Sequence, residues 1–365
     1  MDFSGRQQRV REALQKSRLN SLLVTHLPNI RYLCGFSGSA GALLVGEGGS
    51  TFFTDGRYTS QAKEQVRGAK VVIGKKSPLA AAAEHFSRRT GRRRAGRTYV
   101  LGIEDQYLTV AARRSLSEAL PRHVRLREAP ALVERARMIK DADELALIRE
   151  AAGLGASLFN QALGVIRPGA KEVEVAAEME YAARKAGADA MSFETIVAAG
   201  ARSALPHGRA SSAPIASGGF VVCDFGVILH GYCSDRTRTV YVGAVTAEAR
   251  RVYDAVLAAQ HAAIDAVRPG IEVGKVDGAA RKFLQKNGLA RYFTHSTGHG
   301  VGLEIHEAPR LAQGQQEILR PGMVITIEPG VYLPGKWGVR IEDMVVVTEQ
   351  DCEVLAPTQK EFMEI

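Results

Sequence analysis

Two pairs of acidic residues interrupt otherwise apolar, strand-like runs of the chain. Asp224 and Asp235 flank a short break at Leu229–Gly231, and a turn centred on Leu229 and His230 would place the two side chains opposite each other. Facing Cβ atoms in such a hairpin lie about 4.5–5.5 Å apart, so two carboxylates repel. Asp is also a poor strand former. Either one carboxyl is protonated or a cation lies between them.

The C-terminal region repeats this arrangement. Val324–Gly330 runs toward a Pro-Gly turn, and Val339–Val345 returns from it. A hairpin centred near Gly335 would place Glu328 opposite Glu342. The four carboxylates carry four negative charges, which two divalent cations would balance. Spacing and charge alone therefore predict a dinuclear metal site.

Histidines accompany these carboxylates. His295, His299 and His306 fall within twelve positions of a glycine-rich segment, and His207 follows a Leu-Pro pair in a predicted turn. A lone histidine is more often structural than a ligand, but three in one such segment favour a site, because glycine lets the backbone approach a bound group. Four carboxylates and one imidazole suit Mn²⁺, Co²⁺, Fe²⁺ or Zn²⁺. Two such ions activate water and polarise a carbonyl, so we predict metal-assisted hydrolysis.

The bulk composition is that of a soluble globular protein. The 365 residues are 45% hydrophobic and 24% charged, and the length suggests two domains. No stretch approaches about 18 uninterrupted apolar residues, so we expect no membrane span. The N-terminus lacks an apolar signal core, and the four cysteines are scattered. We expect a reduced, cytoplasmic protein.

Charge is unevenly distributed along the chain. Residues 1–140 hold 26 Lys/Arg and 11 Asp/Glu, a net charge of +15, and residues 141–365 hold 22 and 28, a net charge of −6. The basic run Arg88–Arg94 could bind nucleic acid, but no aromatic residues are interleaved, so we favour a solvated surface loop. Gly35–Gly41 lacks the Gly-Lys-Ser/Thr ending of a phosphate-binding loop. The absence of a G-x-S-x-G motif disfavours a serine hydrolase.

Residues 1–130 alternate between helical and strand-like segments, which predicts an α/β domain. The predicted helices are Arg6–Ser17, Arg57–Gln65, Pro78–Arg89 and Leu108–Leu120, and the predicted strands are Ser21–Val24, Ala42–Val45, Thr51–Thr54, Val71–Ile73, Val100–Ile103 and Val124–Leu126. Asn29–Gly35 leads into the glycine-rich stretch and is assigned to neither a helix nor a strand.

An internal repeat organises the remainder of the chain. Asp141 and Glu144 form a predicted capping box that opens a long helix. Val165–Val173 resembles Ala266–Val273, 101 residues later, and each segment follows one helix and opens another. Each half therefore holds two helices followed by a hairpin with a carboxylate pair. Packing of the halves about a pseudo-twofold axis would bring the two pairs together.

The motifs together resemble the pita-bread metallopeptidase family, which includes Xaa-Pro aminopeptidases, Xaa-Pro dipeptidases (prolidases) and methionine aminopeptidases. The resemblance rests on Cys223–Gly226, Tyr232–Thr239, His295–Gly302, Thr326–Gly330 and Val339–Asp343, and on Arg31–Ser39 and Thr54–Tyr58, which resemble the accessory domain of the proline-specific members. It implies a creatinase-like α/β domain over residues 1–135. It also implies a pseudo-twofold pita-bread catalytic domain, with a curved antiparallel sheet, over residues 136–365.

The resemblance also assigns roles to individual residues. It implies five metal ligands, with two bridging both ions: Asp224, Asp235, His299, Glu328 and Glu342, of which Asp235 and Glu342 bridge. It further implies that Glu328 shuttles a proton, that His207 and His306 contact the substrate and the developing oxyanion, and that His295 lines the proline pocket. Arg340 is expected beside the metal site, where it and His295 bind substrate. In the predicted register Arg340 also shares a strand face with Glu342, so it could orient that carboxylate.

The expected activity is hydrolysis of the Xaa-Pro bond at the N-terminus of peptides with two divalent ions, Mn²⁺ foremost. An aminopeptidase is slightly favoured over a dipeptidase, and the sequence leaves the two open. A non-catalytic binding module is the third hypothesis. It is disfavoured because all five implied metal ligands are present. The substrates would be peptides with proline at the second position. We also expect a homodimer, by resemblance, and no nucleic-acid or membrane partner.

Overall fold

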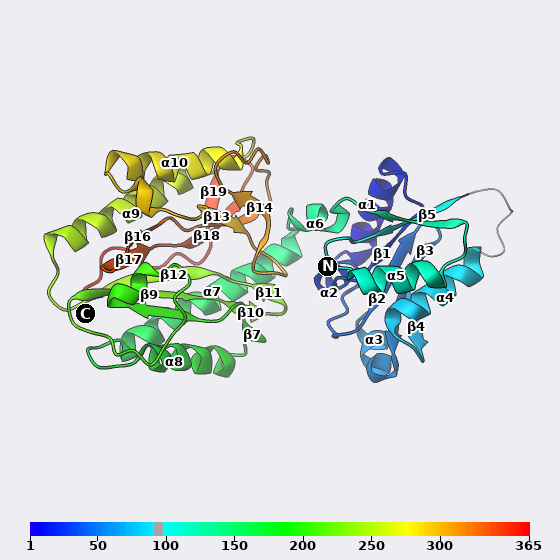
Figure 1. The fold of residues 1–365 in the computed structure, drawn as a ribbon, viewed down its shortest axis with the longest axis horizontal. Helices are drawn as coiled ribbons and strands as arrows, with labels where there is room; N and C mark the ends of the chain where they lie inside the picture. The colour runs from blue at the N-terminus through cyan, green and yellow to red at the C-terminus, as the bar shows by residue number, and fades with distance from the viewer. Residues whose placement is uncertain (91–97) are drawn as a thin grey trace. The chain divides into compact units, whose positions relative to one another are not determined.

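The computed structural model describes residues 1–90 and 98–365 (Figure 1). The chain divides into two compact units, residues 1–137 and 138–365. Residues 91–94 of the predicted basic run lie outside the described residues. The assignment of residues 1–135 as an accessory domain and of residues 136–365 as a catalytic domain stays a prediction. No helix in the described ranges is long and apolar enough to cross a membrane.

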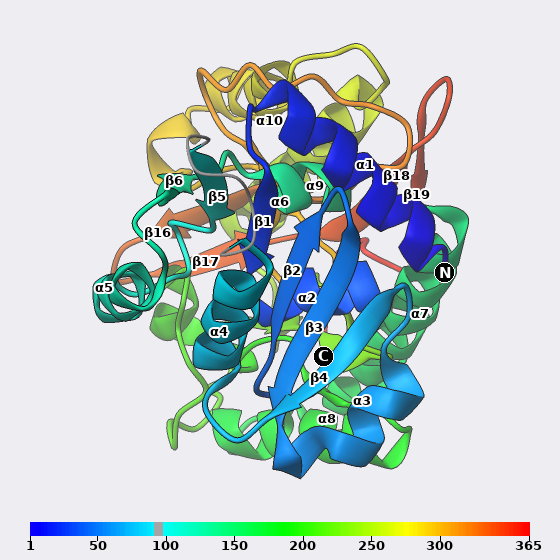
Figure 2. The same ribbon diagram turned by 90° about the vertical axis from the view of Figure 1, so that its right-hand side faces the viewer.

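The first unit is built on a six-stranded mixed sheet in the order β4-β3-β2-β1-β5-β6 (Figure 2). The β1–β2 and β2–β3 pairs are antiparallel, and the β1–β5, β3–β4 and β5–β6 pairs are parallel. The strands are β1 (Ser21–Val24), β2 (Ala42–Gly46), β3 (Gly49–Asp55), β4 (Ala69–Gly74), β5 (Tyr99–Ile103) and β6 (Val124–Glu128). The predicted α/β alternation is confirmed in this unit.

Helices pack against this sheet through apolar side chains. They are α1 (Phe3–Lys16), α2 (Leu27–Cys34), α3 (Thr59–Gln65), α4 (Pro78–Thr90), α5 (Val110–Ala119) and α6 (Leu132–Arg137), with a short 3₁₀ turn, η1 (Gly56–Tyr58), before α3. Phe86 of α4 and Leu116 of α5 are buried in one cluster with Leu23 and Phe53 of the sheet. The sequence missed α2, whose eight residues include a proline in the first turn and end at the left-handed Gly35.

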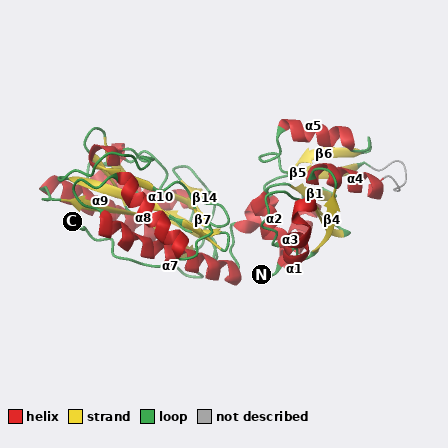
Figure 3. Ribbon diagram, turned by 90° about the horizontal axis from the view of Figure 1, so that it is seen from below, coloured by secondary structure: helices red, strands yellow, loops and turns green. Residues whose placement is uncertain are grey.

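In the second unit, two helix pairs enclose the strands (Figures 1 and 3). The helices are α7 (Ala142–Val165), α8 (Glu172–Lys185), α9 (Ala247–Ala266) and α10 (Val273–Lys286), with 3₁₀ turns η2 (Gly200–Ala204) and η3 (Ala290–Tyr292). One apolar cluster joins α7 and α8 to strands within residues 196–242, and a second joins α9 and α10 to strands within residues 324–347. The predicted helical repeat is therefore confirmed.

All pairings between named strands within residues 138–365 are antiparallel. The strands are β7 (Ala190–Met191), β8 (Ile196–Ala199), β9 (Gly219–Phe225), β10 (Val227–Leu229), β11 (Tyr232–Cys233), β12 (Arg236–Val242), β13 (Gly298–Gly300), β14 (Glu307–Leu311), β15 (Val324–Ile327), β16 (Gly330–Leu333), β17 (Trp337–Arg340), β18 (Asp343–Val347) and β19 (Cys352–Val354). We call β9–β12 the first ribbon and β15–β18 the second ribbon.

Local signals in the sequence explain the starts of the helices in the second unit. The capping box at α7 forms as predicted, because Glu144 N–H donates to Asp141 and Asp141 N–H donates to Glu144. The two Arg-Pro-Gly repeats turn through left-handed glycines, Gly169 (φ 87°) and Gly270 (φ 85°), just before α8 and α10. Glycine adopts this conformation without strain, so each repeat separates two helices.

The predicted register of the first ribbon is wrong by two residues. Asp224 pairs with Thr237, not with Asp235, and Leu229 pairs with Tyr232. The turn therefore contains His230 and Gly231, both with positive φ (50° and 80°). Two-residue hairpins favour this geometry, and glycine at the second position suits it. Because side chains alternate with period two, the shift leaves Asp235 on the same face as Asp224.

The first ribbon is also interrupted beside the site, at Gly226 and at Ser234–Asp235. A Cβ atom added to Gly226 would lie 1.9 Å from the Ser234 carbonyl oxygen, so the two segments approach each other as closely as glycine permits. Asp235 lies between β11 and β12, outside both strands. In the second ribbon the register is as predicted. Ile327 pairs with Asp343 and Gly330 with Arg340, which places Glu328 and Glu342 opposite each other between these pairs.

Candidate metal centre

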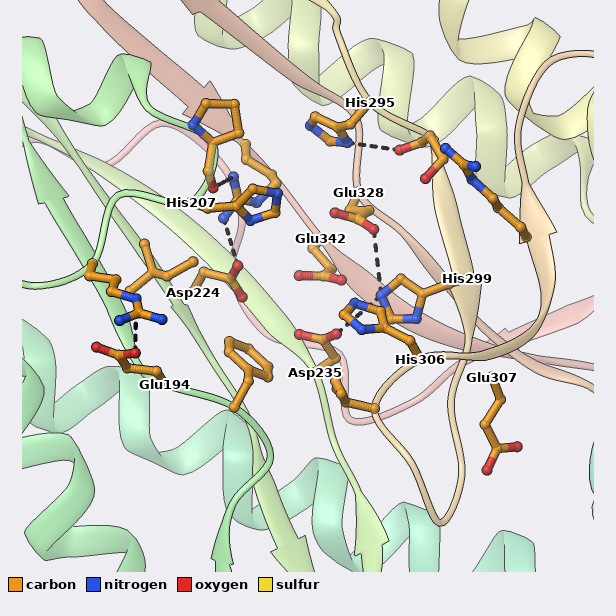
Figure 4. Close-up of a pocket in the computed structure, with 18 residues that line it drawn as sticks. Glu194, His207, Asp224, Asp235, His295, His299, His306, Glu307, Glu328 and Glu342 are labelled. Carbon is orange, nitrogen blue, oxygen red and sulfur yellow. Dashed lines mark hydrogen bonds and ion pairs between the residues drawn. The ribbon is translucent and has the colours of Figure 1, made fainter. Parts of the chain in front are cut away.

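The five predicted ligands project from the two ribbons and from β13 toward a common space (Figure 4). Asp224 lies near the end of β9, and Asp235 immediately precedes β12. His299 is the middle residue of β13, Glu328 follows β15, and Glu342 precedes β18. The structure thus brings together residues that are up to 118 positions apart in the chain, a separation that follows directly from their numbers.

Distances place these groups within reach of a shared ion. His299 Nε2 lies 3.5 Å from Asp235 Oδ2 and 3.6 Å from Glu328 Oε1. One ligand atom from each of Asp235, His299 and Glu342 lies within 4.8 Å of the others. Side chains that share a divalent ion are held at such separations, because each donor lies about 2 Å from the ion.

The tautomer of His299 is fixed by its backbone contact. His299 Nδ1 lies 3.0 Å from the Gly300 carbonyl oxygen, which can only accept, so Nδ1 carries the hydrogen. The Nε2 lone pair is then directed at the carboxylates. Burial lowers the pKa of His299 to about 4, with a smaller contribution from His306, so the ring is neutral near pH 7. A neutral imidazole with its second nitrogen hydrogen-bonded is the form that binds metals.

The carboxylates are held in a region that opposes their charge. Burial is the largest cause that raises the pKa of Glu328 to about 8, and Asp224 adds to it. Burial and neighbouring carboxylates raise the pKa values of Asp235 and Glu342 well above their usual range. Acidic groups crowded in this way either bind protons or bind cations. Divalent ions would replace the protons.

Asp224 provides a direct test of fit for a metal. Its Oδ2 accepts a hydrogen bond of 2.6 Å from Arg340, whereas its Oδ1 is buried and has no hydrogen-bond partner among the described residues. A buried carboxylate oxygen without a partner is costly unless a ligand satisfies it. Together with the lone pair of His299, this oxygen gives a donor set that fits divalent ions.

Arg340 is fully engaged in holding the site. Its guanidinium donates to four partners, namely Thr237 Oγ1 (3.0 Å), the Pro206 carbonyl (3.1 Å), the Tyr332 hydroxyl (2.7 Å) and Asp224 Oδ2 (2.6 Å). The sequence predicted that Arg340 shares a face with Glu342 and orients that carboxylate. The hydrogen bond goes to Asp224 instead, so Arg340 orients a ligand of the first ribbon.

His295 lies against Tyr332 at one side of the site. Its Nδ1 lies 2.8 Å from the Ser296 carbonyl, and its Nε2 lies 2.9 Å from the Tyr332 hydroxyl. That hydroxyl accepts from Arg340, so its own hydrogen is free to go to Nε2. Burial and, to a smaller extent, the charge of Arg340 together lower the pKa of His295 to about 4. The ring is therefore a neutral wall of the pocket.

The other two predicted histidines face the same space (Figure 4). The ring of His306 packs edge-on against that of His299, with centroids 4.4 Å apart, and burial lowers its pKa. His207 is exposed. Both line a cavity of about 660 Å³ together with all five predicted ligands.

The cavity contains further residues that the sequence did not single out. Phe193, Ile196 and Ile305 give it apolar walls, and Arg310 adds a cation. Arg310 pairs with His299 in the β13–β14 ladder, so the two side chains share a face of the sheet. The side chain of Arg310 makes no hydrogen bond or ion pair within residues 1–90 and 98–365. An unpaired cation beside the predicted ligands is available to an anionic group of a substrate.

Residues at even spacing from the ligands support them, and sequence spacing could have found them. Thr237 lies two residues after Asp235 and donates to Glu342 Oε2 at 2.7 Å. Thr326 lies two residues before Glu328, and its Oγ1 accepts from His299 N–H at 3.1 Å. Residues two apart in an extended chain share a face, which is the signal that was missed.

Glu307 follows His306 but turns away from the ligands (Figure 4). Its carboxylate accepts from Lys140 Nζ at 3.2 Å and from Glu304 N–H at 3.2 Å. The two charged side chains are only 1% (Lys140) and 6% (Glu307) exposed. This buried ion pair anchors the strand that follows His306 to the residues just before α7.

Comparison with known proteins agrees with this geometry. Residues 146–349 match the family described as "Metallopeptidase family M24", which is more than half of the chain. The chain belongs to metallopeptidase family M24. Residues 6–139 match the "Creatinase/Prolidase N-terminal domain". The predicted family, the combination of a creatinase-like and a pita-bread fold, and the class of metallopeptidase are thereby confirmed.

Individual M24 relatives are similar over almost their whole length. The "Xaa-Pro dipeptidase" of Pyrococcus horikoshii is 35% identical over 96% of this chain and 97% of that protein. The solved "Xaa-Pro dipeptidase from Bacillus anthracis" is 38% identical, with a TM-score of 0.94 and full coverage of both chains. The "X-Pro aminopeptidase from Thermotoga maritima" is 33% identical, with a TM-score of 0.88 over 99% of this chain and 100% of that one.

Proposed function

We propose that this M24 metallopeptidase hydrolyses the bond between a first residue and proline, and that it acts as an Xaa-Pro dipeptidase. The observation that supports this best is the convergence of Asp224, Asp235, His299, Glu328 and Glu342 on one cavity that also contains a neutral histidine wall and an unpaired arginine. The sequence slightly favoured an aminopeptidase. Two of the relatives above are named Xaa-Pro dipeptidases, and they support the dipeptidase, which the sequence left open as the alternative.

The ligand set supports two divalent ions, held by the five residues as the sequence predicts. Bound there, they would activate a water molecule and polarise the scissile carbonyl. We propose Mn²⁺, because carboxylate oxygens dominate the set and such ligands suit that ion, with Co²⁺, Zn²⁺ or Fe²⁺ as alternatives. Asp235 and Glu342, the two most deeply buried of the carboxylates, would be the bridging ligands.

The shape of the cavity supports selection of proline. The amide nitrogen of an Xaa-Pro bond carries no hydrogen, so a pocket must recognise the pyrrolidine ring by shape. His295, which is neutral and fixed by Tyr332, offers a flat wall for that ring. Phe193 and Ile305 offer apolar surface to the side chain of the first residue.

Polar groups around the ligands can serve the bond-breaking step. As the water adds to the carbonyl carbon, Glu328 would accept its proton and pass it to the proline nitrogen as the C–N bond breaks. His207 and His306 both line the cavity, and we propose that they face the carbonyl oxygen as it becomes anionic. Donors placed there would stabilise that oxygen.

Arg310 supports the dipeptidase over the aminopeptidase. In a dipeptide the proline carries a free carboxylate, and an unpaired arginine on the pocket face would bind it with charge-assisted hydrogen bonds. A longer peptide has an amide at that position and gains no such ion pair. The aminopeptidase remains a second candidate, supported by the similarity to the Thermotoga maritima enzyme.

Three substrates separate the candidates when assayed with added Mn²⁺: Ala-Pro, Ala-Pro-amide and Ala-Pro-Ala. We expect Ala-Pro to have the highest kcat/KM. Arg310→Met should lower kcat/KM for Ala-Pro about 10- to 100-fold, the size of one lost charged hydrogen bond, and leave Ala-Pro-amide nearly unchanged. Faster cleavage of Ala-Pro-Ala by the natural enzyme would favour the aminopeptidase. No cleavage of any of the three would refute proline specificity.

Three further properties are part of the proposal. We propose a homodimer, from the resemblance alone. We propose a cytoplasmic location, because all four cysteines lie in the described residues and none forms a disulfide. We also propose that residues 1–135 are accessory and residues 136–365 catalytic, since all the cavity residues belong to the second unit.

A further inference from the structure

Each half of the second unit contains a fully buried carboxylate that the catalytic scheme does not use. Glu172 is the first residue of α8, and Asp277 lies in α10. Both are 0% exposed. Each accepts hydrogen bonds from a loop that carries one histidine of the cavity, Glu172 from the loop of His207 and Asp277 from the loop of His295.

Glu172 binds both ends of the His207 loop. Its Oε1 accepts from Ala199 N–H at 2.8 Å, at the start of the loop. Its Oε2 accepts from Ser211 N–H at 3.0 Å and from the Ser211 hydroxyl at 2.6 Å, at the end of the loop. Twelve positions of chain are thus closed onto one carboxylate, with His207 between the bonded ends.

We call a buried carboxylate together with the loop groups that donate to it a clasp. An arginine completes this first clasp. Arg202 Nε donates to both oxygens of Glu172, at 3.1 and 3.0 Å, and its Nη2 donates to the Arg209 carbonyl at 2.6 Å. The acceptor lies two residues after His207. The carboxylate therefore controls the backbone on each side of that histidine, partly through direct bonds and partly through Arg202.

Asp277 makes similar contacts in the other half, with one loop residue instead of two. Its Oδ1 accepts from Thr297 N–H at 3.2 Å and from the Thr297 hydroxyl at 2.8 Å. Its Oδ2 accepts from Arg281 Nε at 2.7 Å. Arg281 then donates to the backbone carbonyls of Phe293 and His295. Carboxylate, hydroxyl residue and arginine again hold the backbone around one histidine.

The two clasps do not come from equivalent positions of the repeat. Glu172 begins α8, whereas Asp277 lies four residues after Val273, the first residue of α10. A merely inherited structural contact would occupy the same place in both halves. The same chemistry reached from different positions indicates that a fixed loop is what each half requires.

We propose that Glu172 and Asp277 are positioning residues that set the placement of His207 and His295, each for its own half of the site. The proposal rests on the roles given above to the two histidines. Neither carboxylate contacts the predicted metal ligands in the described residues, so their effect on the reaction must pass through the loops. A displacement of a catalytic group by about 1 Å lowers a rate as much as about 100-fold.

Glu172→Gln and Asp277→Asn test the clasps with almost no change in volume. An amide nitrogen in place of one oxygen would face a donor, either the Arg Nε or the N–H and O–H of the loop. We expect Glu172→Gln to lower kcat about tenfold, because His207 faces the reacting carbonyl. We expect Asp277→Asn to raise KM for Ala-Pro about tenfold, because His295 lines the proline pocket. Both variants should retain two Mn²⁺ per chain by metal analysis.

A double-mutant cycle separates positioning from general destabilisation. If Asp277 acts through His295, Asp277→Asn should change kinetics less than about twofold in a His295→Ala background and keep its full effect in a His207→Ala background. Glu172→Gln should behave in the opposite way. Effects that multiply equally in both backgrounds would overturn the proposal. Glu353→Gln, which removes an exposed acid paired with Arg149, is the matched control for loss of charge and should leave kinetics unchanged.

Hydrogen–deuterium exchange gives a readout that does not depend on the substrate. Exchange should rise in residues 199–211 of Glu172→Gln and in residues 293–297 of Asp277→Asn, each without change in the other loop. If the natural protein fails to cleave Ala-Pro, the proposed function fails while this local pattern still stands. Exchange that rises throughout either variant would refute the clasps. Should Asp277→Asn not fold, Arg281→Lys keeps the charge and must give the same local pattern and the same dependence on His295.

Discussion

The two ribbons that carry the ligands differ in regularity and depend on each other. In the second ribbon one register runs through the site and places Glu328 opposite Glu342. In the first ribbon the strands break, and Asp235 lies outside them. The ordered ribbon supplies what the irregular one lacks, because Arg340 of the second ribbon holds Asp224 of the first.

The dependence is reciprocal. Thr237 of the first ribbon donates to the Glu342 carboxylate at 2.7 Å, and its backbone carbonyl accepts from Glu342 N–H at 3.2 Å. Arg238 of the first ribbon also donates to the Glu342 carbonyl at 2.6 Å. Each ribbon is therefore oriented by residues of the other, and the ligand set exists only when both are in place. The predictions below test this mutual support.

The largest effect is expected when a bridging ligand is removed from the irregular ribbon. Asp235→Ala should abolish both metal binding and turnover, because the remaining donors cannot hold two ions against their mutual repulsion. Metal content and Ala-Pro hydrolysis measure the two effects together. Asp254→Ala, an exposed acid on α9, is the control and should retain both. Hydrolysis by a metal-free Asp235→Ala protein would contradict the assignment.

His306 tests a residue that is predicted to contribute to the reaction without being a metal ligand itself. His306→Ala should lower kcat about 10²–10³-fold, the effect of one lost oxyanion donor, with both ions retained. The ring packs against His299 but is not among the predicted ligands. Steady-state kinetics and metal analysis check this, with the exposed His123→Ala as control. An unchanged kcat would remove His306 from the site.

Arg340→Met and Thr237→Val remove the two cross-ribbon supports. Loss of such outer partners lowers metal affinity about 10- to 100-fold in other sites. We expect the larger loss for Arg340→Met, because its guanidinium contacts Asp224 directly and three other groups besides. Mn²⁺ titration by calorimetry measures both. If only one variant weakens binding, the support runs in one direction and the reciprocity is wrong.

The smallest effect concerns the stability of the protein without its metals. Burial raises the pKa of Glu328 from 4.5 to about 8. A pKa that is raised on folding gives stability that is complete below the unfolded-state value and is lost as pH rises through the folded-state value. The Tm of EDTA-treated protein should therefore fall between about pH 5 and pH 9, by roughly 2–4 °C for each kcal/mol lost. Saturating Mn²⁺ should remove the decline, and a metal-free Tm that rises with pH would contradict it.

Local rules predicted the ligands because those rules act over a few residues. The constant register of a hairpin with one turn at Gly335 was enough to place Glu328 and Glu342. The first ribbon failed for an equally local reason, because His230 adopts a left-handed conformation and moves the turn by one residue. The prediction that Asp235 lies on the same face as Asp224 still holds, because a shift of two residues restores the alternation of side chains.

Contacts made between distant segments were not predictable from spacing. Nothing in the sequence near Arg340 shows that its guanidinium reaches Asp224 across 116 positions. Glu172 and Asp277 belong to no motif, and their importance depends on which loops return to them. No sequence motif pointed to Arg310 as a site residue. Only its pairing with His299 in the β13–β14 ladder shows that its side chain lies on the face of the cavity. All of these contacts depend on how distant segments pack together in the folded protein, and local sequence patterns do not show that packing.

The ion pair between Lys140 and Glu307 limits how this protein can be shortened. A catalytic fragment cut at residue 146, where the M24 match begins, would lack Lys140 and deprive a 6%-exposed carboxylate of its lysine partner. Breaking a buried pair in this way costs on the order of 3–5 kcal/mol, a large share of the stability of an ordinary domain. A usable truncation must therefore begin upstream of Lys140, so that the strand following His306 keeps its anchor.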